Sequence, residues 1–229
     1  MNTNFPMSTH DLIPGSGPAI AAQLIDAGCV TVRSDEPFRL PSGWASPVYM
    51  DCRRLISFPE TRRALVAAGL ERLESDNALS GLTAVAGGES SGIALAAWIA
   101  DALNLPLQYV RKRGTGANRV EGVVLKDMKV LLVDDLLAAG ASKAGFVGAL
   151  RARGAKVQDL FVVFDYGVLG ADSLLDSLDL RLHALANWRD VLAAAEARND
   201  FGREARVELA QFLENPSAWS SAHGGIGPA

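Results

Sequence analysis

The hydrophobic residues of this chain follow two different periods, which alternate along its middle. Short runs that are apolar almost throughout are typical of strands buried on both faces, whereas apolar residues repeating every three or four positions are typical of helices. The apolar runs are residues 82–88, 105–110, 130–133, 160–164 and 180–188. Helical periods follow the first run, at residues 93–104, and the third, where Phe146, Val147 and Leu150 share one face. The pattern predicts an α/β fold with a central, mainly parallel sheet flanked by helices.

The residues before this pattern predict a smaller lobe. Residues 17–27 carry the period of an amphipathic helix, which Gly28 ends. Residues 30–33 have the composition of a short strand. Residues 38–55 combine strand-like alternation with Pro41, Ser42, Gly43 and Pro47, so we expect short strands joined by a tight turn.

Helices are predicted on both sides of the sheet region. Ser57 and Glu60 have the spacing of a capping box, which would open a helix leading into the core. The apolar stripe of that helix continues through Val66, Leu70 and Leu73. Near the C-terminus, apolar residues at helical spacing precede Pro216. They are Val207, Leu209, Phe212 and Leu213. We expect the tail from Ser221 onward to fray.

Length and composition fit one substantial core with a smaller appendage. The chain has 229 residues, of which 49% are hydrophobic and 21% charged. We expect three parts: an N-terminal helix and small hood lobe in residues 1–60, the core in 61–190, and a C-terminal helical segment with its tail in 191–229. Cys29 and Cys52 lack the spacing of a metal or redox site, so we expect both to be buried apolar residues.

Charge and hydropathy exclude several classes of partner. No run approaches the roughly 20 apolar residues that cross a bilayer, and the first residues lack the pattern of a secretory signal. We therefore expect a cytoplasmic protein with no membrane partner. The net charge of −4 provides no overall attraction for nucleic acid, so any phosphate site must be local.

The most informative segment for chemistry is residues 130–146. Its apolar strand leads into Asp134 and Asp135, at the carboxyl end where parallel sheets bind ligands. Two carboxylates there can accept hydrogen bonds from the two neighbouring hydroxyls of a ribose. The small residues 138–142 let backbone N–H groups and a helix N-terminus surround a monophosphate, with Ser142 as a hydroxyl donor or N-cap. The segment therefore predicts a site for ribose 5-phosphate.

Other interpretations of this segment remain open. The two acids can simply end a strand, with Gly140 in an ordinary turn. They could also bind Mg²⁺ as in a nucleotide hydrolase, but the chain has no GxxxxGK[ST] loop, and residues 86–92 do not supply the GxGxxG of a dinucleotide site. The histidines are not clustered in sequence, which disfavours a histidine metal site. They are His10, His183 and His223.

Four segments together resemble the orotate phosphoribosyltransferases, a branch of the type I phosphoribosyltransferase fold. The segment VLLVDDLLAAGAS is similar to the family's signature for phosphoribosyl diphosphate (PRPP). The other three are FRLPSGWASPVYMDCR in the lobe, GGESSGIALA in the turn beside the diphosphate, and YVRKR before a flexible loop. The resemblance spans roughly residues 38–166. It implies transfer of the ribose 5-phosphate group of PRPP to orotate, giving orotidine 5′-monophosphate and diphosphate in pyrimidine biosynthesis.

The resemblance also implies roles for individual residues. Asp134, Asp135, Lys112 and Arg119 would be catalytic. The PRPP-binding residues would be Ser90, Ser91, Arg111, Lys112, Asp134, Asp135, Leu136, Leu137, Ala138, Ala139, Gly140, Ala141 and Ser142. Orotate would contact Tyr49, Met50, Ala138 and Tyr166. Mg²⁺ would be the cofactor, bound through PRPP and not directly by the protein, and the partners would be PRPP, orotate and a second copy in a homodimer.

The chain departs from the family's pattern at several cations. Pro41 and Ser91 stand where the best-studied members have lysines, and Thr115 and Ala117 stand where the flexible loop has a lysine and a histidine. Arg113 or Arg119 could replace a loop cation. Two further differences are Ala138 in place of a threonine and Tyr166 in place of an arginine. These departures keep two alternatives open: a phosphoribosyltransferase for another base, and a non-catalytic or regulatory PRPP-binding protein of the same fold.

Overall fold

The computed structural model describes residues 15–33, 35–40, 42–168 and 170–226, and these form two compact units. One unit lies within residues 59–185, and the other combines the described residues before 59 with those after 185. The unit boundaries lie within a few residues of the predicted positions 60 and 190. The segment 191–229, which the sequence set apart, belongs with the N-terminal lobe.

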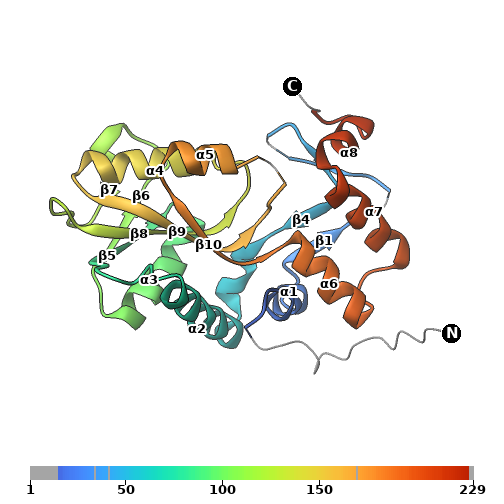
Figure 1. Ribbon diagram of the computed structural model, residues 1–229, viewed down its shortest axis with the longest axis horizontal. Coiled ribbons are helices and arrows are strands. Elements are labelled where there is room, and N and C mark those ends of the chain that lie inside the picture. Colours follow the sequence, from blue (N-terminus) through green and yellow to red (C-terminus); the bar gives the residue numbers. More distant parts are fainter. Residues whose placement is uncertain (1–14, 34, 41, 169, 227–229) are drawn as a thin grey trace. The chain divides into compact units, whose positions relative to one another are not determined.

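The unit 59–185 is built on a six-stranded sheet in the order β10-β9-β8-β5-β6-β7 (Figure 1). The strands are β5 (Ala84–Gly88), β6 (Leu107–Val110), β7 (Val120–Glu121), β8 (Lys129–Leu137), β9 (Lys156–Asp165) and β10 (Arg181–Asn187). Strand β5 pairs in parallel with β6 and β8, and β8 pairs in parallel with β9, whereas β7 is antiparallel to β6. The predicted mainly parallel sheet is confirmed.

Helices cover both faces of this sheet. Figure 1 shows α2 and α3 on one face and α4 and α5 on the other. Their bounds are α2 (Pro59–Ser75), α3 (Ser91–Leu103), α4 (Ala141–Ala152) and α5 (Asp172–Ser177). Strands buried from two sides favour apolar residues at every position, which explains the continuous apolar runs at residues 130–133 of β8 and 160–164 of β9. Leu132 and Leu160 of these strands and Phe146 and Leu150 of α4 are fully buried in one core cluster.

Helix α2 begins later than the capping-box pattern predicts. It starts at Pro59, and Ser57 is the last residue of the 3₁₀ helix η2 (Cys52–Ser57), so the capping box is wrong. Proline is favoured at the first helical position because its missing N–H would have no partner there. The fully buried positions of α2 are Leu65, Gly69 and Leu73.

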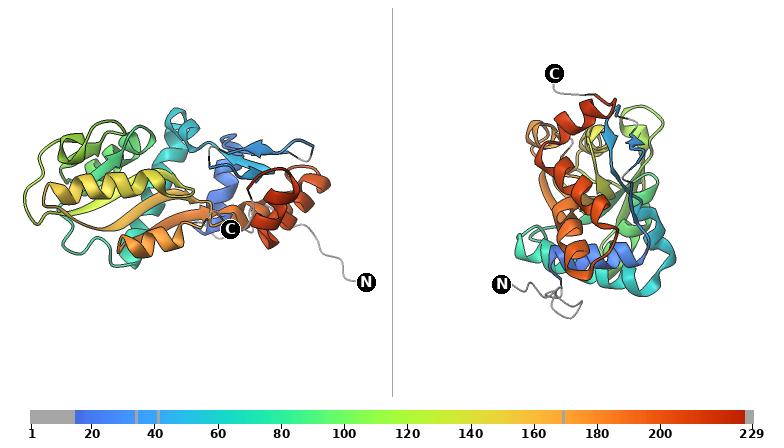
Figure 2. Two further views of the ribbon diagram at one scale, coloured as in Figure 1. Left: turned by 90° about the horizontal axis from the view of Figure 1, so that it is seen from above. Right: turned by 90° about the vertical axis from the view of Figure 1, so that its right-hand side faces the viewer.

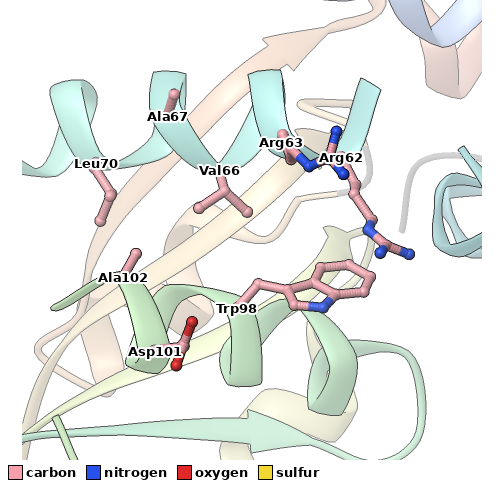
Figure 3. A pocket seen from close by; sticks show the side chains of 8 residues that line it. All are labelled: Arg62, Arg63, Val66, Ala67, Leu70, Trp98, Asp101 and Ala102. Carbon is pink, nitrogen blue, oxygen red and sulfur yellow. The ribbon is translucent and has the colours of Figure 1, made fainter. Parts of the chain in front are cut away.

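The other two residues of the predicted stripe, Val66 and Leu70, line a groove between α2 and α3 (Figure 3). The groove has a volume of about 370 Å³. Across it, the guanidinium of Arg62 lies 4.7 Å from the ring centre of Trp98. The groove therefore combines an apolar floor with a cation and an aromatic ring.

The second unit joins the N-terminal lobe to the C-terminal helices. Strand β1 pairs with β4 and β2 pairs with β3, both antiparallel. The elements are α1 (Gly17–Asp26), β1 (Val30–Val32), β2 (Phe38–Arg39), β3 (Ala45–Ser46), β4 (Val48–Met50), α6 (Trp188–Arg198), α7 (Arg203–Glu214) and α8 (Pro216–Ala222). Figure 2 shows the C-terminal helices beside these N-terminal strands. Cys29 and Cys52 are buried as free thiols, as predicted.

The C-terminal tail is ordered by this lobe through residue 226, so the predicted fraying from Ser221 is wrong there. The backbone N–H of Ile226 donates to the carbonyl of Gly43 at 3.0 Å. The Ser220 hydroxyl, fully buried, accepts a hydrogen bond from the N–H of Ala45 at 3.0 Å. Within the described part of the chain, no helix is long and apolar enough to cross a membrane.

Candidate functional site

Asp134 and Asp135 lie inside β8, because the strand continues to Leu137 instead of ending at Val133 as predicted. The reason lies in the neighbouring strands. Pairing with β5 stops at Val133, whereas pairing with β9 continues to Leu137. Beyond Val133 one edge of β8 therefore has no strand beside it, which leaves the acid pair at an open edge of the sheet.

Asp134 is buried and its two oxygens have different partners. One oxygen, Oδ2, forms an ion pair with Nζ of Lys143. The other, Oδ1, accepts the N–H of Asp135 at 3.0 Å. The lysine side chain is 7% exposed and the aspartate side chain 8% exposed, so the pair is desolvated on both sides.

Asp135 is half-buried, and its Oδ1 accepts the N–H of Leu136 at 2.9 Å. Burial raises the pKa of the Asp135 carboxyl to about 6, and the neighbouring charge of Asp134 contributes in the same direction. A carboxyl group whose pKa is raised toward neutral pH, next to a second acid, is typical of a functional site.

The turn from β5 into α3 packs directly against this acid pair. A Cβ atom on Gly92 would lie 2.4 Å from the carbonyl oxygen of Val133, and one on Gly88 would lie 2.5 Å from the ring of Phe146. Both positions therefore require glycine for packing alone. The turn itself is formed by Glu89 and Ser90, which are joined by a cis peptide bond.

Ser90 and Ser91 open helix α3, with Ser90 as an N-cap whose side chain makes no capping hydrogen bond. Glu89 accepts a hydrogen bond from the backbone N–H of Lys112. The structure thus links the turn to the end of β6, where the basic pair Arg111 and Lys112 was predicted to face the diphosphate.

The predicted phosphate cradle follows β8 and leads into α4. Gly140 is the N-cap of this helix, with φ of 78°, a left-handed conformation that suits glycine. Ser142 is therefore not the N-cap; it is an exposed residue of the first helical turn. Leu136 and Leu137 are strand residues, and Leu137 is fully buried, so it could offer a ligand only backbone groups. Ala138 and Ala139 complete the loop.

The predicted cations are placed differently from one another. Arg111 is exposed and forms an ion pair with Glu121 at 3.1 Å. Lys112 is also exposed. Arg119 donates from Nε to the carbonyl of Arg111 at 2.7 Å and from Nη1 to the carbonyl of Gly145 at 3.3 Å, so it is held against α4 and is not a free loop residue.

The predicted orotate contacts divide between the two units. Ala138 and Tyr166 lie near each other in the sheet unit, because the N–H of Tyr166 donates to the carbonyl of Leu137 at 2.8 Å. Tyr166 is only 4% exposed. Tyr49 and Met50 belong to the lobe, where Met50 is 2% exposed, so its side chain offers little surface to a ligand.

Lys143 is the site residue that was missed in the sequence. Its spacing carries a signal, since residues 143, 146, 147 and 150 form one helical face and the other three are buried apolar residues. A lysine on that face predicts an acidic partner in the core. Of the other positions discussed for the family, Thr115 is exposed, and Pro41 lies outside the described residues.

The groove between α2 and α3 is lined by none of the predicted site residues. Within the described ranges, no group of three or more His, Cys, Asp or Glu side chains could hold a metal ion. Within the unit 59–185, the acid pair, the glycine turn and the loop before α4 lie together, and most of the residues predicted for PRPP belong to them.

Comparisons with known proteins agree with this description. The family model of the phosphoribosyl transferase domain matches residues 65–175. The orotate phosphoribosyltransferase of Rhizobium johnstonii is 39% identical over 210 residues, which cover 90% of this chain and 91% of the relative. That of Cereibacter sphaeroides is 41% identical over 206 residues, covering 88% and 89%. The crystal structure of orotate phosphoribosyltransferase from Aeropyrum pernix aligns with a TM-score of 0.67 at 34% identity, covering 76% of this chain and 96% of that one.

Proposed function

The chain belongs to the orotate phosphoribosyltransferase family, and we propose that it transfers the 5-phosphoribosyl group of PRPP to orotate, with the acid pair Asp134 and Asp135 at the ribose. The products are orotidine 5′-monophosphate and diphosphate, so the reaction serves pyrimidine biosynthesis. The observation that carries the proposal is the position of the acid pair. It lies at the open edge of β8, between a glycine-rich turn and the N-terminus of α4.

In this proposal the two substrates supply the nucleophile and the leaving group, and the protein positions them. Asp134 and Asp135 accept hydrogen bonds from the ribose hydroxyls. The backbone of residues 138–142 and the N-terminus of α4 bind the 5′-phosphate. Arg111 and Lys112, with the turn at Ser90 and Ser91, face the diphosphate, where positive charge stabilises the negative charge that develops as the bond breaks. A covalent enzyme intermediate is not needed.

Magnesium fits this arrangement as a cation carried by the substrate. Mg²⁺ in phosphate sites usually keeps several waters and the substrate's own oxygens as ligands, so PRPP can carry the cation without a direct bond to the protein. When bound, the cation neutralises diphosphate charge. The chain's own contribution is to hold the ribose and phosphate groups at fixed positions.

The base side and the assembly are part of the same proposal. Tyr49, Met50, Ala138 and Tyr166 remain the proposed orotate contacts, with backbone groups as the contact at Met50, since its side chain is buried. We also propose a cytoplasmic homodimer, as the family resemblance implies. Arg119 serves as the loop cation only if it releases its contacts with Arg111 and Gly145 when substrate binds.

The test is diphosphate release from PRPP with magnesium, measured with orotate and with a panel of other bases. We expect release that depends on orotate, with kcat/KM far higher than for uracil, adenine or hypoxanthine. Release that depends on another base would assign the chain to a different phosphoribosyltransferase. Binding of PRPP without release in the presence of any base would show a non-catalytic protein.

A further inference from the structure

Lys143 occupies a position that is unfavourable for a lysine on two grounds. It is the third residue of α4, where the partial positive charge of the helix N-terminus repels a cation. Its side chain is also almost completely buried, so its charge has lost most of its hydration. The carboxylate of Asp134 compensates both costs through the ion pair.

The glycines of the β5–α3 turn pack closely against the carboxylate of Asp134. A Cβ on Gly88 would lie 3.2 Å from Oδ2, and a Cβ on Gly92 would lie 3.0 Å from Oδ1. One oxygen is bound by Lys143 and the other by the N–H of Asp135. The lysine therefore fixes the orientation of the first acid, and the chain from Asp134 to Asp135 orients the second.

The same lysine balances the charge of the acid pair. Two adjacent carboxylates in a partly dehydrated site tend to share one proton. Burial raises the pKa of Asp135 most, the charge of Asp134 raises it further, and the charge of Lys143 lowers it. Around the pair, the β5–α3 turn contributes glycines and Glu89, whose carboxylate accepts the N–H of Lys112. Strand β9 contributes Val162 and Phe164, with Asp165 opposite Leu137. Lys143 on α4 is thus the cation that acts on both acids.

We propose that Lys143 is a positioning residue for ribose recognition, which through its ion pair with Asp134 holds that carboxylate, and the acid pair with it, in place for PRPP. The inference rests on the proposed function, since it takes PRPP as the ligand of the acid pair. Lys143 itself does not touch the substrate.

The first experiment compares Lys143→Met with a surface control. Lys156→Met removes a lysine that is 62% exposed and paired with Asp127. Calorimetric titration with PRPP and magnesium across about pH 5.5–8.5 gives affinity, and thermal unfolding gives stability. We expect Lys143→Met to weaken PRPP binding most at the acidic end of this range, by about tenfold near pH 5.5, because below the pKa a rise of one unit lowers the ionised fraction of Asp135 about tenfold. The fall in affinity toward low pH should therefore begin at a higher pH than in the wild type. Lys156→Met should match the wild type.

A second comparison separates this role from a purely structural one and does not need Lys143→Met to fold. Asp134→Asn removes the negative charge that raises the pKa of Asp135. Asp134→Asn with Lys143→Met also removes the positive charge that lowers it. The pH below which PRPP affinity falls should therefore be higher in the double variant than in Asp134→Asn alone. Two outcomes would overturn the inference. In one, PRPP affinity falls at the same acidic pH in these two variants. In the other, Lys143→Met lowers the melting temperature but leaves the pH dependence of PRPP affinity unchanged, so that Lys143 contributes to stability alone.

The inference about Lys143 and the proposed function can fail separately. Wild-type protein that binds PRPP with the expected pH profile but releases no diphosphate with orotate would contradict the proposed transfer and leave the role of Lys143 in place. Wild-type protein that does not bind PRPP would contradict both.

Discussion

Asp135 is the member of the proposed acid pair whose pKa burial raises. Its folded pKa of about 6 exceeds the unfolded value of about 3.9, so the folded protein binds this proton more tightly. Stability contributed by the proton is present at low pH and is lost as the pH rises through about 6. At neutral pH the ionised Asp135 is therefore a cost to folding.

The variant Asp135→Asn tests this balance. Its melting temperature at pH 7.5 should equal or exceed that of the wild type, and any gain should shrink as the pH is lowered toward about 4. PRPP affinity should fall about ten- to hundredfold, since a hydrogen bond to a charged acceptor is lost. A protein that becomes less stable at neutral pH while keeping its PRPP affinity would remove Asp135 from the site.

At this scale the sequence predicted residue types better than residue partners. The adjacent acids and the small residues after them were recognisable because their chemistry is local. Lys143 was visible only as a break in an apolar helical face, and its partner Asp134 lies nine residues earlier, on a different element. The pairing depends on how α4 packs on the sheet, which the local pattern does not contain.

Among the elements, the close packing of α3 on β8 positions the acid pair. Gly92→Ala would place a methyl group 2.4 Å from the backbone carbonyl of Val133, which cannot move without displacing β8. We expect a loss of about 1–3 kcal/mol in the free energy of unfolding, and weaker PRPP binding because the strand shifts at Asp134. Urea unfolding and titration measure the two effects.

The matched control for this substitution is Gly148→Ala in α4. No atom lies within 4 Å of the added Cβ there, and alanine is the better helix former. The free energy of unfolding should rise by about 0.5–1 kcal/mol with PRPP affinity unchanged. Equal effects of the two substitutions would show that the contact between Gly92 and β8 is unimportant.

A second group of elements is joined by His183, which is buried near the start of β10. Its Nδ1 lies 2.7 Å from Asp76, after the end of α2, and its Nε2 lies 3.0 Å from the buried Asp159 of β9. His183→Leu should lower the free energy of unfolding by about 2–4 kcal/mol, because it leaves buried charge with fewer partners. PRPP affinity at neutral pH should be unchanged, since none of the three residues belongs to the proposed site.

The stability loss in His183→Leu should depend on pH. The hydrogen bond from His183 lowers the pKa of Asp76, so the stability it contributes is present above the unfolded value of about 3.9 and is lost as the pH falls through the folded pKa. The difference between the variant and the wild type should therefore narrow below about pH 4. A constant difference across pH would assign the loss to packing alone.

The ends of elements were harder to predict than their existence. The apolar run 130–133 correctly marked a buried strand, but β8 continues through two charged residues because β9 pairs with it up to Leu137. Similarly, α2 begins at Pro59 because Ser57 is the last residue of the 3₁₀ helix before it. In both cases a neighbouring element decides the boundary.

For the whole molecule, the C-terminal helices complete the lobe that the N-terminal strands begin. The sequence pattern predicts residues 191–229 as a separate segment, because contacts with residues far earlier in the chain leave no local signal. One such contact is the hydrogen bond from the N–H of Ala45 to the hydroxyl of Ser220. Ser220→Ala should lower the free energy of unfolding by about 1–3 kcal/mol, since it leaves a buried N–H without an acceptor. Ser221→Ala, at an exposed neighbour, should leave it unchanged, and equal effects would mean that the tail does not stabilise the lobe.

The central claim is that the chain catalyses transfer to orotate at the acid pair of β8. The most direct measurement follows PRPP, orotate, diphosphate and orotidine 5′-monophosphate together, by chromatography, for the wild type and for Asp134→Asn with Asp135→Asn. The wild type should form one orotidine 5′-monophosphate and one diphosphate for each PRPP consumed, and the double variant should remain folded with little turnover. Consumption of PRPP without orotidine 5′-monophosphate, or full turnover in the folded double variant, would contradict the account.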